Sequence, residues 1–173
     1  GEGIRAEREL LAPLRKWAQM VIDTTGYGRN HLQQAMRERF AQDPSGALTI
    51  TVTSFGFARG MPPIADLVFD MRFLDNPHWI DELREQTGRD PAVAAHIQAD
   101  PAFDTAFEKI AGLVQSLIPL YAAQGRAYLT VAFGCTGGQH RSVTMAEDHA
   151  LRLAEAGWPV SIRHRELDRQ RIA

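Results

Sequence analysis

Hydrophobic residues along the chain follow two spacings in turn, and these predict an alternation of strands and helices. Four runs rich in apolar and β-branched residues have the length and the flanking turns of strands. These runs cover residues 47–57, 65–73, 126–135 and 158–167. Helical spacing predicts short helices within residues 77–100, an amphipathic helix over 101–123 and another over 141–156. Short connections between alternating elements indicate the α/β fold class, with a mainly parallel sheet and flanking helices.

The first 46 residues follow a pattern of their own. The apolar residues of ERELLAPLRKW have helical spacing, MVIDTT (20–25) has the composition of a short buried strand, and residues 31–42 carry a second helical stripe. We expect residues 1–46 to form this helix, strand and helix, and residues 47–173 to form the main unit. The chain starts without methionine inside a helical pattern, so we expect a fragment or a processed product.

Composition narrows the class of protein. The chain has 173 residues, 45% of them hydrophobic, with a formal charge of −2 and a pI of about 6.3. No apolar run approaches the roughly 18 to 20 residues of a membrane span, so we expect a cytoplasmic protein without membrane contact. All basic residues except Lys16 and Lys109 are arginine, whose planar fork suits phosphate. No zinc-type cysteine pair and no GxxxxGK(S/T) loop is present, so we expect no metal site and no nucleoside triphosphatase.

The stretch GCTGGQHRS, residues 134–142, carries the chain's single cysteine between a predicted strand and a predicted helix. Cys135, five residues, Arg141 and Ser142 have the spacing of a cysteine-phosphatase loop, in which backbone N–H groups and an arginine hold an oxyanion. Gly134 stands where that loop usually has histidine, and the glycine placement differs. The pattern therefore leaves three interpretations open: a glycine turn with a buried cysteine, an anion cradle without catalysis, and a working phosphatase.

Polar residues also gather where the second predicted strand ends, in FDMRFLDNPHW. Strand alternation would send Asp70 and Arg72 to one face, where they either pair with each other or contact a phosphate and the hydroxyls of a ligand. Asn76 and His78 lie in the adjoining loop and could complete such a site. Since ligands of parallel sheets bind at the carboxyl ends of strands, this loop and the 134–142 stretch are expected to meet.

Two further stretches would lie at the same edge of the sheet. SFGFARG contributes Ser54 and Arg59, the latter either solvated or in contact with a phosphate. In SIRHREL, strand alternation would place Arg163 and Arg165 on one face and His164 on the other. These arginines are either solvated residues at the end of a strand or anion contacts.

Taken in order, these motifs resemble one family. SFGF..G.P..AD, VFD.RFL.NPHW, TG.D..V, YLT.A.GCTGGQHRSV..AE and V..RHREL resemble the carboxyl-terminal domain of the RapZ/YvcJ proteins. The likeness covers nearly all of residues 4–168. ERELLAPLR and VIDTT resemble the segment that joins this domain to an amino-terminal P-loop domain, so residues 1–46 would be an interdomain segment.

The resemblance implies a non-enzymatic regulatory domain whose fold resembles a phosphofructokinase subdomain. Full-length members of the family are nucleotide-binding adaptors, and some present small regulatory RNA to an endoribonuclease and so regulate amino-sugar synthesis. Their carboxyl-terminal domain forms homo-oligomers and senses glucosamine 6-phosphate. ATP or GTP would belong to the absent P-loop domain, so no cofactor is expected in this chain.

Motif by motif, the resemblance and the residue patterns define one set of candidate ligand-binding residues. The set comprises Ser54, Arg59, Asp70, Arg72, Asn76, His78, Cys135, Thr136, Gly137, Gly138, Gln139, His140, Arg141, Ser142, His164 and Arg165. A candidate RNA surface comprises Arg59, Arg163, Arg165, Arg169 and Arg171. RNA-binding members have a lysine where Ala58 stands and a lysine-rich end, here LDRQRIA, so weaker and more salt-sensitive RNA binding is expected.

The leading hypothesis is a metabolite sensor that binds a phosphorylated amino sugar or a sugar nucleotide, with RNA as a further partner. One alternative is a phosphatase with Cys135 as nucleophile and Arg141 on the phosphoryl group. Another is an RNA-binding module without a metabolite site.

Overall fold

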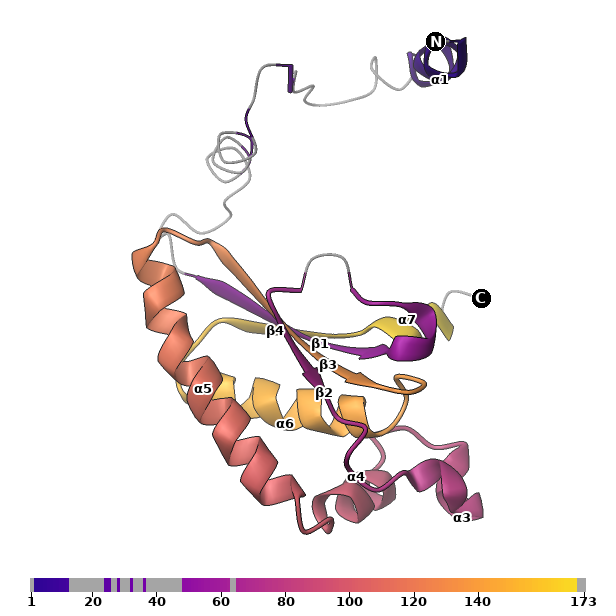
Figure 1. The fold of residues 1–173 in the computed structure, drawn as a ribbon, viewed down its shortest axis with the longest axis vertical. Helices are drawn as coiled ribbons and strands as arrows, with labels where there is room; N and C mark the ends of the chain where they lie inside the picture. The colour runs from indigo at the N-terminus through magenta and orange to yellow at the C-terminus, as the bar shows by residue number, and fades with distance from the viewer. Residues whose placement is uncertain are drawn as a thin grey trace. The chain divides into compact units, whose positions relative to one another are not determined.

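The computed structural model divides the chain into two units, Gly1–Pro44 and Ser45–Ala173 (Figure 1). Its described residues are 2–12, 24–25, 28, 32, 36, 48–62 and 65–170. The strand predicted at 20–25 and the helix predicted at 31–42 lie almost wholly outside these residues. In the first unit, helix α1 (Glu2–Leu11) forms where helical spacing predicted it, and Ile4, Leu10 and Leu11 are exposed on it.

The second unit is built on a four-stranded sheet in the order β2-β3-β1-β4, with every pair of neighbours parallel. The strands are β1 (Thr49–Gly56), β2 (Leu67–Asp70), β3 (Tyr128–Cys135) and β4 (Val160–His164). The α/β class with a parallel sheet and flanking helices is therefore confirmed. Since the strands share one direction, their carboxyl ends lie along one edge of the sheet.

Helices connect these strands and lie mainly on one side of the sheet (Figure 1). The connecting elements are the 3₁₀-helices η2 (Phe57–Arg59) and η3 (Pro77–Trp79) and the α-helices α3 (Asp81–Arg84), α4 (Pro91–Gln98), α5 (Phe103–Ala123) and α6 (Arg141–Glu155). Helix α7 (Arg165–Gln170) follows β4. The β2–α5–β3 and β3–α6–β4 crossovers advance in the same direction across the sheet. Right-handed crossovers of this kind place α5 and α6 on the same face. Among the described residues, no helix has the length and apolar character to span a membrane.

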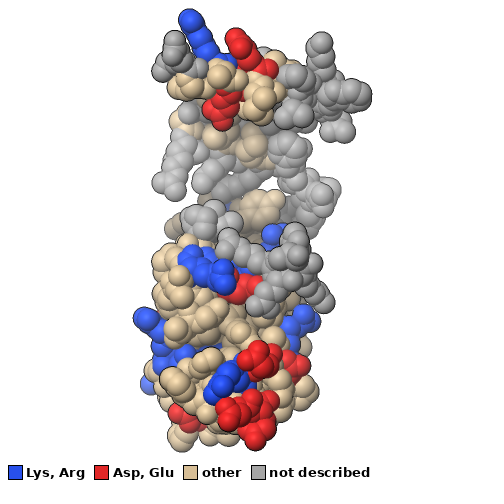
Figure 2. Space-filling view, turned by 90° about the vertical axis from the view of Figure 1, so that its right-hand side faces the viewer, with Lys and Arg blue, Asp and Glu red and all other residues tan. Residues whose placement is uncertain are grey.

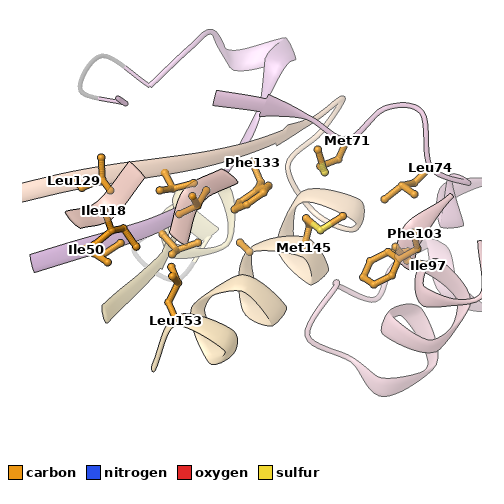
Figure 3. Packing of buried hydrophobic residues seen from close by; sticks show 14 of the residues in the cluster. Ile50, Met71, Leu74, Ile97, Phe103, Ile118, Leu129, Phe133, Met145 and Leu153 are labelled. Atoms are coloured by element: carbon orange, nitrogen blue, oxygen red, sulfur yellow. The ribbon is translucent and has the colours of Figure 1, made fainter. Parts of the chain in front are cut away.

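The hydrophobic core lies between this face and the helices (Figure 3). It combines alternate residues of β1 and β3 with residues of α4, α5 and α6. The members include Ile50, Val52, Val93, Ile97, Val114, Ile118, Leu129, Val131, Phe133, Met145 and Leu153. The opposite face carries hydroxyl side chains that are half-buried or exposed, namely Thr49, Thr51, Thr53, Thr130 and Ser161. The period of two thus separates an apolar face from a polar one.

Two predicted strands end earlier than expected. β2 stops at Asp70 because its carboxylate accepts the backbone N–H of Arg72 at 2.9 Å, which turns the chain. β4 stops at His164, and α7 starts at Arg165, where a strand was predicted to continue to residue 167. The predictions that Arg72 shares a strand face with Asp70, and Arg165 with Arg163, are therefore wrong.

His149 is a titratable residue in the core. Its ring lies 4.5 Å, centroid to centroid, from both Phe107 and Phe133, and its Nδ1–H donates to the carbonyl oxygen of Met145 at 2.9 Å. Nε2 is buried and has no hydrogen-bond partner among the described residues. Burial lowers the pKa of His149 from 6.5 to about 4, because the charged form would lose its hydration.

This histidine should make the domain sensitive to acid. Between pH 6.5 and about 4 the unfolded chain binds a proton that the folded chain excludes, so stability falls as pH falls through this range. The two pKa values differ by the equivalent of about 3 kcal/mol of unfolding free energy. Urea denaturation across pH 4 to 7.5 should show this decline, and His149→Phe should flatten it. Equal pH profiles for both proteins would contradict the assignment.

Candidate functional site

The loop between β3 and α6 forms the centre of the candidate site. Residues 136–140 connect the strand to the helix, and His140 takes the cap position of α6 without a side-chain cap. Within the described part of the chain, the backbone N–H groups of Thr136, Gly137, Gln139, His140, Arg141 and Ser142 have no hydrogen-bond partner. Free N–H groups at the positive end of a 15-residue helix are the arrangement that binds anions.

A pocket of about 260 Å³ opens against this loop. Eight of the sixteen candidate residues line it, namely Asn76, His78, Cys135, Thr136, Gly137, Gln139, His140 and Arg141. The lining contains no carboxylate and includes one arginine and two histidines. The pocket therefore favours an anionic or neutral polar ligand over a cation.

Arg141 forms the inner wall of the pocket and is only 5% exposed. Its Nη1 donates to the carbonyl oxygens of Arg72 and Leu74, each at 3.0 Å, and its Nη2 donates to Thr136 Oγ1 at 3.4 Å. Its Nε–H is buried, and the part of the chain that the structure describes offers it no acceptor. The guanidinium therefore holds the segment after β2 against the β3–α6 loop, and adds positive charge behind the N–H groups.

Gln139 and His140 attach a second segment to the loop. The Gln139 side-chain amide donates to the carbonyl oxygens of Gln86 at 2.7 Å and Arg84 at 3.2 Å. His140 Nε2 lies 3.2 Å from the same Arg84 oxygen, and because a carbonyl only accepts, this nitrogen carries the proton. Burial lowers the pKa of His140, so its ring is neutral near pH 7 and contributes no full charge.

Cys135 ends β3 and points into a network behind the pocket surface. Its Sγ lies 3.1 Å from Ser142 Oγ and accepts the Gly138 backbone N–H at 3.3 Å. The thiol is buried, although the residue borders the pocket. Ser142 and Gly138 therefore stabilise the loop from behind and do not line the pocket.

Asp70 and Arg72 contact each other at the surface. Arg72 Nε and Nη2 donate to the Asp70 carboxylate at 2.6 to 3.0 Å, and the guanidinium stacks on the Phe57 ring at 4.5 Å. These hydrogen bonds lower the pKa of Asp70. Of the two alternatives that the sequence left open, the structure shows mutual pairing, and neither residue lines the pocket.

Ser54 and His164 belong to a buried chain of hydrogen bonds. Ser54 Oγ lies 2.8 Å from His164 Nδ1, and His164 Nε2 lies 3.0 Å from Glu147 Oε1. The same Glu147 oxygen pairs with Arg89 Nε at 3.0 Å. The order resembles a Ser-His-acid triad, but Ser54 is fully buried and does not line the pocket of the β3–α6 loop. The chain of bonds connects β1, β4 and α6 and so stabilises the base of the site.

Arg59 and Arg165 contact a buried carboxylate, Glu166. Its Oε1 accepts Arg165 Nε at 2.7 Å and the Gly56 N–H at 3.3 Å, and its Oε2 lies 3.4 Å from Arg59 Nε. Arg163 is exposed on β4, whereas the side chain of Arg169 and the whole of Arg171 lie outside the described residues. Of the RNA candidates, two are therefore engaged with Glu166.

Sequence reasoning missed Glu147 and Glu166. Glu147 ends the GCTGGQHRSV..AE motif, but its partners His164 and Arg89 are distant in sequence, so no local spacing indicates its role. Glu166 stands inside the RHREL motif, where it was interpreted as part of a strand. Among the described residues, no group of three or more His, Cys, Asp or Glu side chains is arranged to hold a metal ion.

The described residues form a parallel α/β domain with a small polar pocket at the carboxyl edge of its sheet. The chain belongs to the RapZ C-terminal domain family, whose model matches residues 48–168. This confirms the resemblance drawn from its motifs.

The chain is also similar to three bacterial relatives, each named a nucleotide-binding protein. The chain is 61% identical over 165 residues to that of Novosphingobium aromaticivorans, covering 95% of this chain and 54% of the relative. It is 59% identical over 166 residues to that of Erythrobacter litoralis, covering 96% and 55%. For Sphingopyxis alaskensis the identity is 50% over 167 residues, covering 96% and 53%. The chain thus spans about half the length of these relatives.

Gly56 allows the end of β1 to approach the pocket loop closely. A Cβ on Gly56 would lie 2.7 Å from the carbonyl carbon and oxygen of Gly137, so Gly56→Ala must displace the pocket loop. We expect it to lower the unfolding free energy by about 1 to 3 kcal/mol. Gly112→Ala, in α5 with nothing within 4 Å of the added Cβ, is the control and should raise stability by about 0.5 to 1 kcal/mol. Urea denaturation measures both, and a neutral Gly56→Ala would contradict this packing.

Proposed function

We propose that this domain is a non-enzymatic regulatory module that binds a phosphorylated amino sugar, such as glucosamine 6-phosphate, in the pocket of the β3–α6 loop. The observation that carries the proposal is that the loop whose N–H groups have no partner among the described residues also lines a pocket without carboxylates. A phosphate would accept from these N–H groups, as anions do at helix N-termini. Asn76 and His78 would contact the sugar hydroxyls and amine.

Membership of the RapZ C-terminal domain family supports the regulatory part of the proposal. The relatives' name, nucleotide-binding protein, describes chains about twice as long, so nucleotide binding is not transferred from the name to this half. Cytoplasmic location and assembly into homo-oligomers remain predictions that follow from the family resemblance.

The geometry favours binding over phosphatase chemistry. In the phosphatase interpretation Arg141 would grip the phosphoryl group with two parallel N–H donors. Here its Nη1 is engaged by the carbonyl oxygens of Arg72 and Leu74, and its Nε is buried. A turnover assay with an aryl phosphate, compared with Cys135→Ser, separates the two functions.

Fewer observations support RNA binding than support the binding of a sugar phosphate. RNA affinity depends largely on cations that neutralise phosphates, and the described candidates Arg59 and Arg165 both contact Glu166. Figure 2 shows basic and acidic side chains interspersed on the visible face, without a continuous basic stripe. Presentation of small regulatory RNA to an endoribonuclease therefore stays a secondary proposal.

Calorimetry tests the metabolite proposal. Glucosamine 6-phosphate should bind the purified chain, whereas glucosamine, which lacks the phosphate, should give no measurable heat. Gly137 borders the pocket and has nothing within 4 Å of an added Cβ, so Gly137→Leu should fill the pocket and weaken binding about tenfold or more. Its melting temperature should match that of the wild type. Equal affinity for both sugars, or no binding by a folded chain, would refute the proposal.

A further inference from the structure

Trp79 presents the largest kind of apolar side chain to solvent beside the pocket. It is 78% exposed, although tryptophan is usually largely buried in folded proteins. Its neighbour in sequence, His78, lines the pocket. The two rings meet edge to face with centroids 5.5 Å apart. The exposed indole therefore stands one ring away from the pocket wall.

Trp79 is the last residue of η3, a turn that several hydrogen bonds hold in place. η3 follows Asn76, whose side chain accepts the His78 N–H at 3.4 Å, and the Trp79 N–H donates to the Asn76 carbonyl oxygen at 3.2 Å. Arg84 Nε donates to the His78 carbonyl oxygen at 3.0 Å, and Pro77 is buried. Because the backbone beneath the ring is already ordered, a ligand that stacks on the ring does not have to order the turn.

The size of the pocket limits what it can enclose. Its volume of about 260 Å³ is below the roughly 300 to 1,000 Å³ of sites that bury drug-sized ligands. A phosphate with one sugar ring matches this space, whereas a nucleobase attached to them would extend past the rim. His78 lines the pocket, and the Trp79 ring contacts the His78 ring.

We propose that Trp79 is a stacking platform for the planar base of a nucleoside phosphate or sugar nucleotide whose phosphate occupies the pocket. The inference rests on the proposed anion site and extends its ligand class from sugar phosphates to nucleotides. Aromatic side chains bind bases through their faces with little dependence on base identity. The site would therefore discriminate between ligands by whether they carry a base and by the distance of that base from the phosphate.

Two ligands that share ribose and phosphate test this inference. Uridine 5′-monophosphate carries a base, and ribose 5-phosphate does not. By calorimetry the nucleotide should bind about tenfold more tightly, in the range measured for base–aromatic stacking. Trp79→Ala should remove the difference and leave ribose 5-phosphate binding unchanged, and Trp79→Tyr should retain most of it. Phe73→Ala is the matched control, because Phe73 is also exposed, at 53%, on the same segment.

The outcomes distinguish this inference from the proposed function. Equal affinity for both ligands, unaffected by Trp79→Ala, would overturn the stacking platform and leave the phosphate site standing. Absence of binding by both ligands and by glucosamine 6-phosphate would overturn the phosphate site itself. A change of oligomeric mass in Trp79→Ala, measured by sedimentation, with an unchanged affinity ratio would assign the indole to a protein interface and overturn the inference.

Discussion

The site depends on one buried guanidinium. Arg141 begins α6, and its Nη1 is bound by two backbone carbonyl oxygens of the segment that follows β2. Hydrogen bonds from a charged donor are stronger than neutral ones, and buried carbonyl groups need partners. The arginine therefore provides hydrogen-bond donors for the carbonyl groups of the turn after Asp70 and fixes the segment that leads into η3. Without it, Asn76 and His78 would have no defined position relative to the N–H groups of the loop.

A second constraint comes from the glycines where strands end. Gly138 has a φ of 75°, and a Cβ there would lie 2.5 Å from the Gly56 nitrogen and 2.6 Å from Glu166 Cγ. The loop can therefore pass against the end of β1 only with glycine at this position. Glu166 occupies the space behind it and accepts the Gly56 N–H. Backbone shape and a buried carboxylate together fix the position of the loop against the end of β1.

Local sequence patterns predicted the parts of the fold that rest on local physics. Apolar runs placed β1 and β3, and helical periodicity placed α5 and α6, because burial on one face imposes these spacings. The 134–142 stretch and the Asn76–His78 loop were expected to meet, and the parallel sheet brings them to one pocket. The end of β4 was misplaced because Asp168 accepts the His164 N–H at 3.3 Å and α7 begins there.

Where the predictions from sequence differ from the structure, the cause is a partner that is distant along the chain. Arg141 was interpreted as a ligand contact, and its carbonyl partners lie 69 and 67 residues away. His164 was counted among the candidate ligand-binding residues, but it pairs with Glu147 and with the buried Ser54. The sequence allowed two alternatives for Asp70 and Arg72, mutual pairing or ligand contact. Only the structure shows that the two side chains pair. Membership of the proposed binding set is still a prediction for all sixteen residues.

The row of threonines on the sheet face opposite α5 and α6 has a consequence for solubility. Parallel sheets usually bury both faces and therefore use apolar residues on both. Threonine keeps the β-branched shape that suits an extended backbone, while its hydroxyl can remain hydrated. Thr51 and Ser161 even share a hydrogen bond across neighbouring strands at 3.1 Å. Such a surface lets a small parallel sheet meet water without the flat apolar patch that drives aggregation.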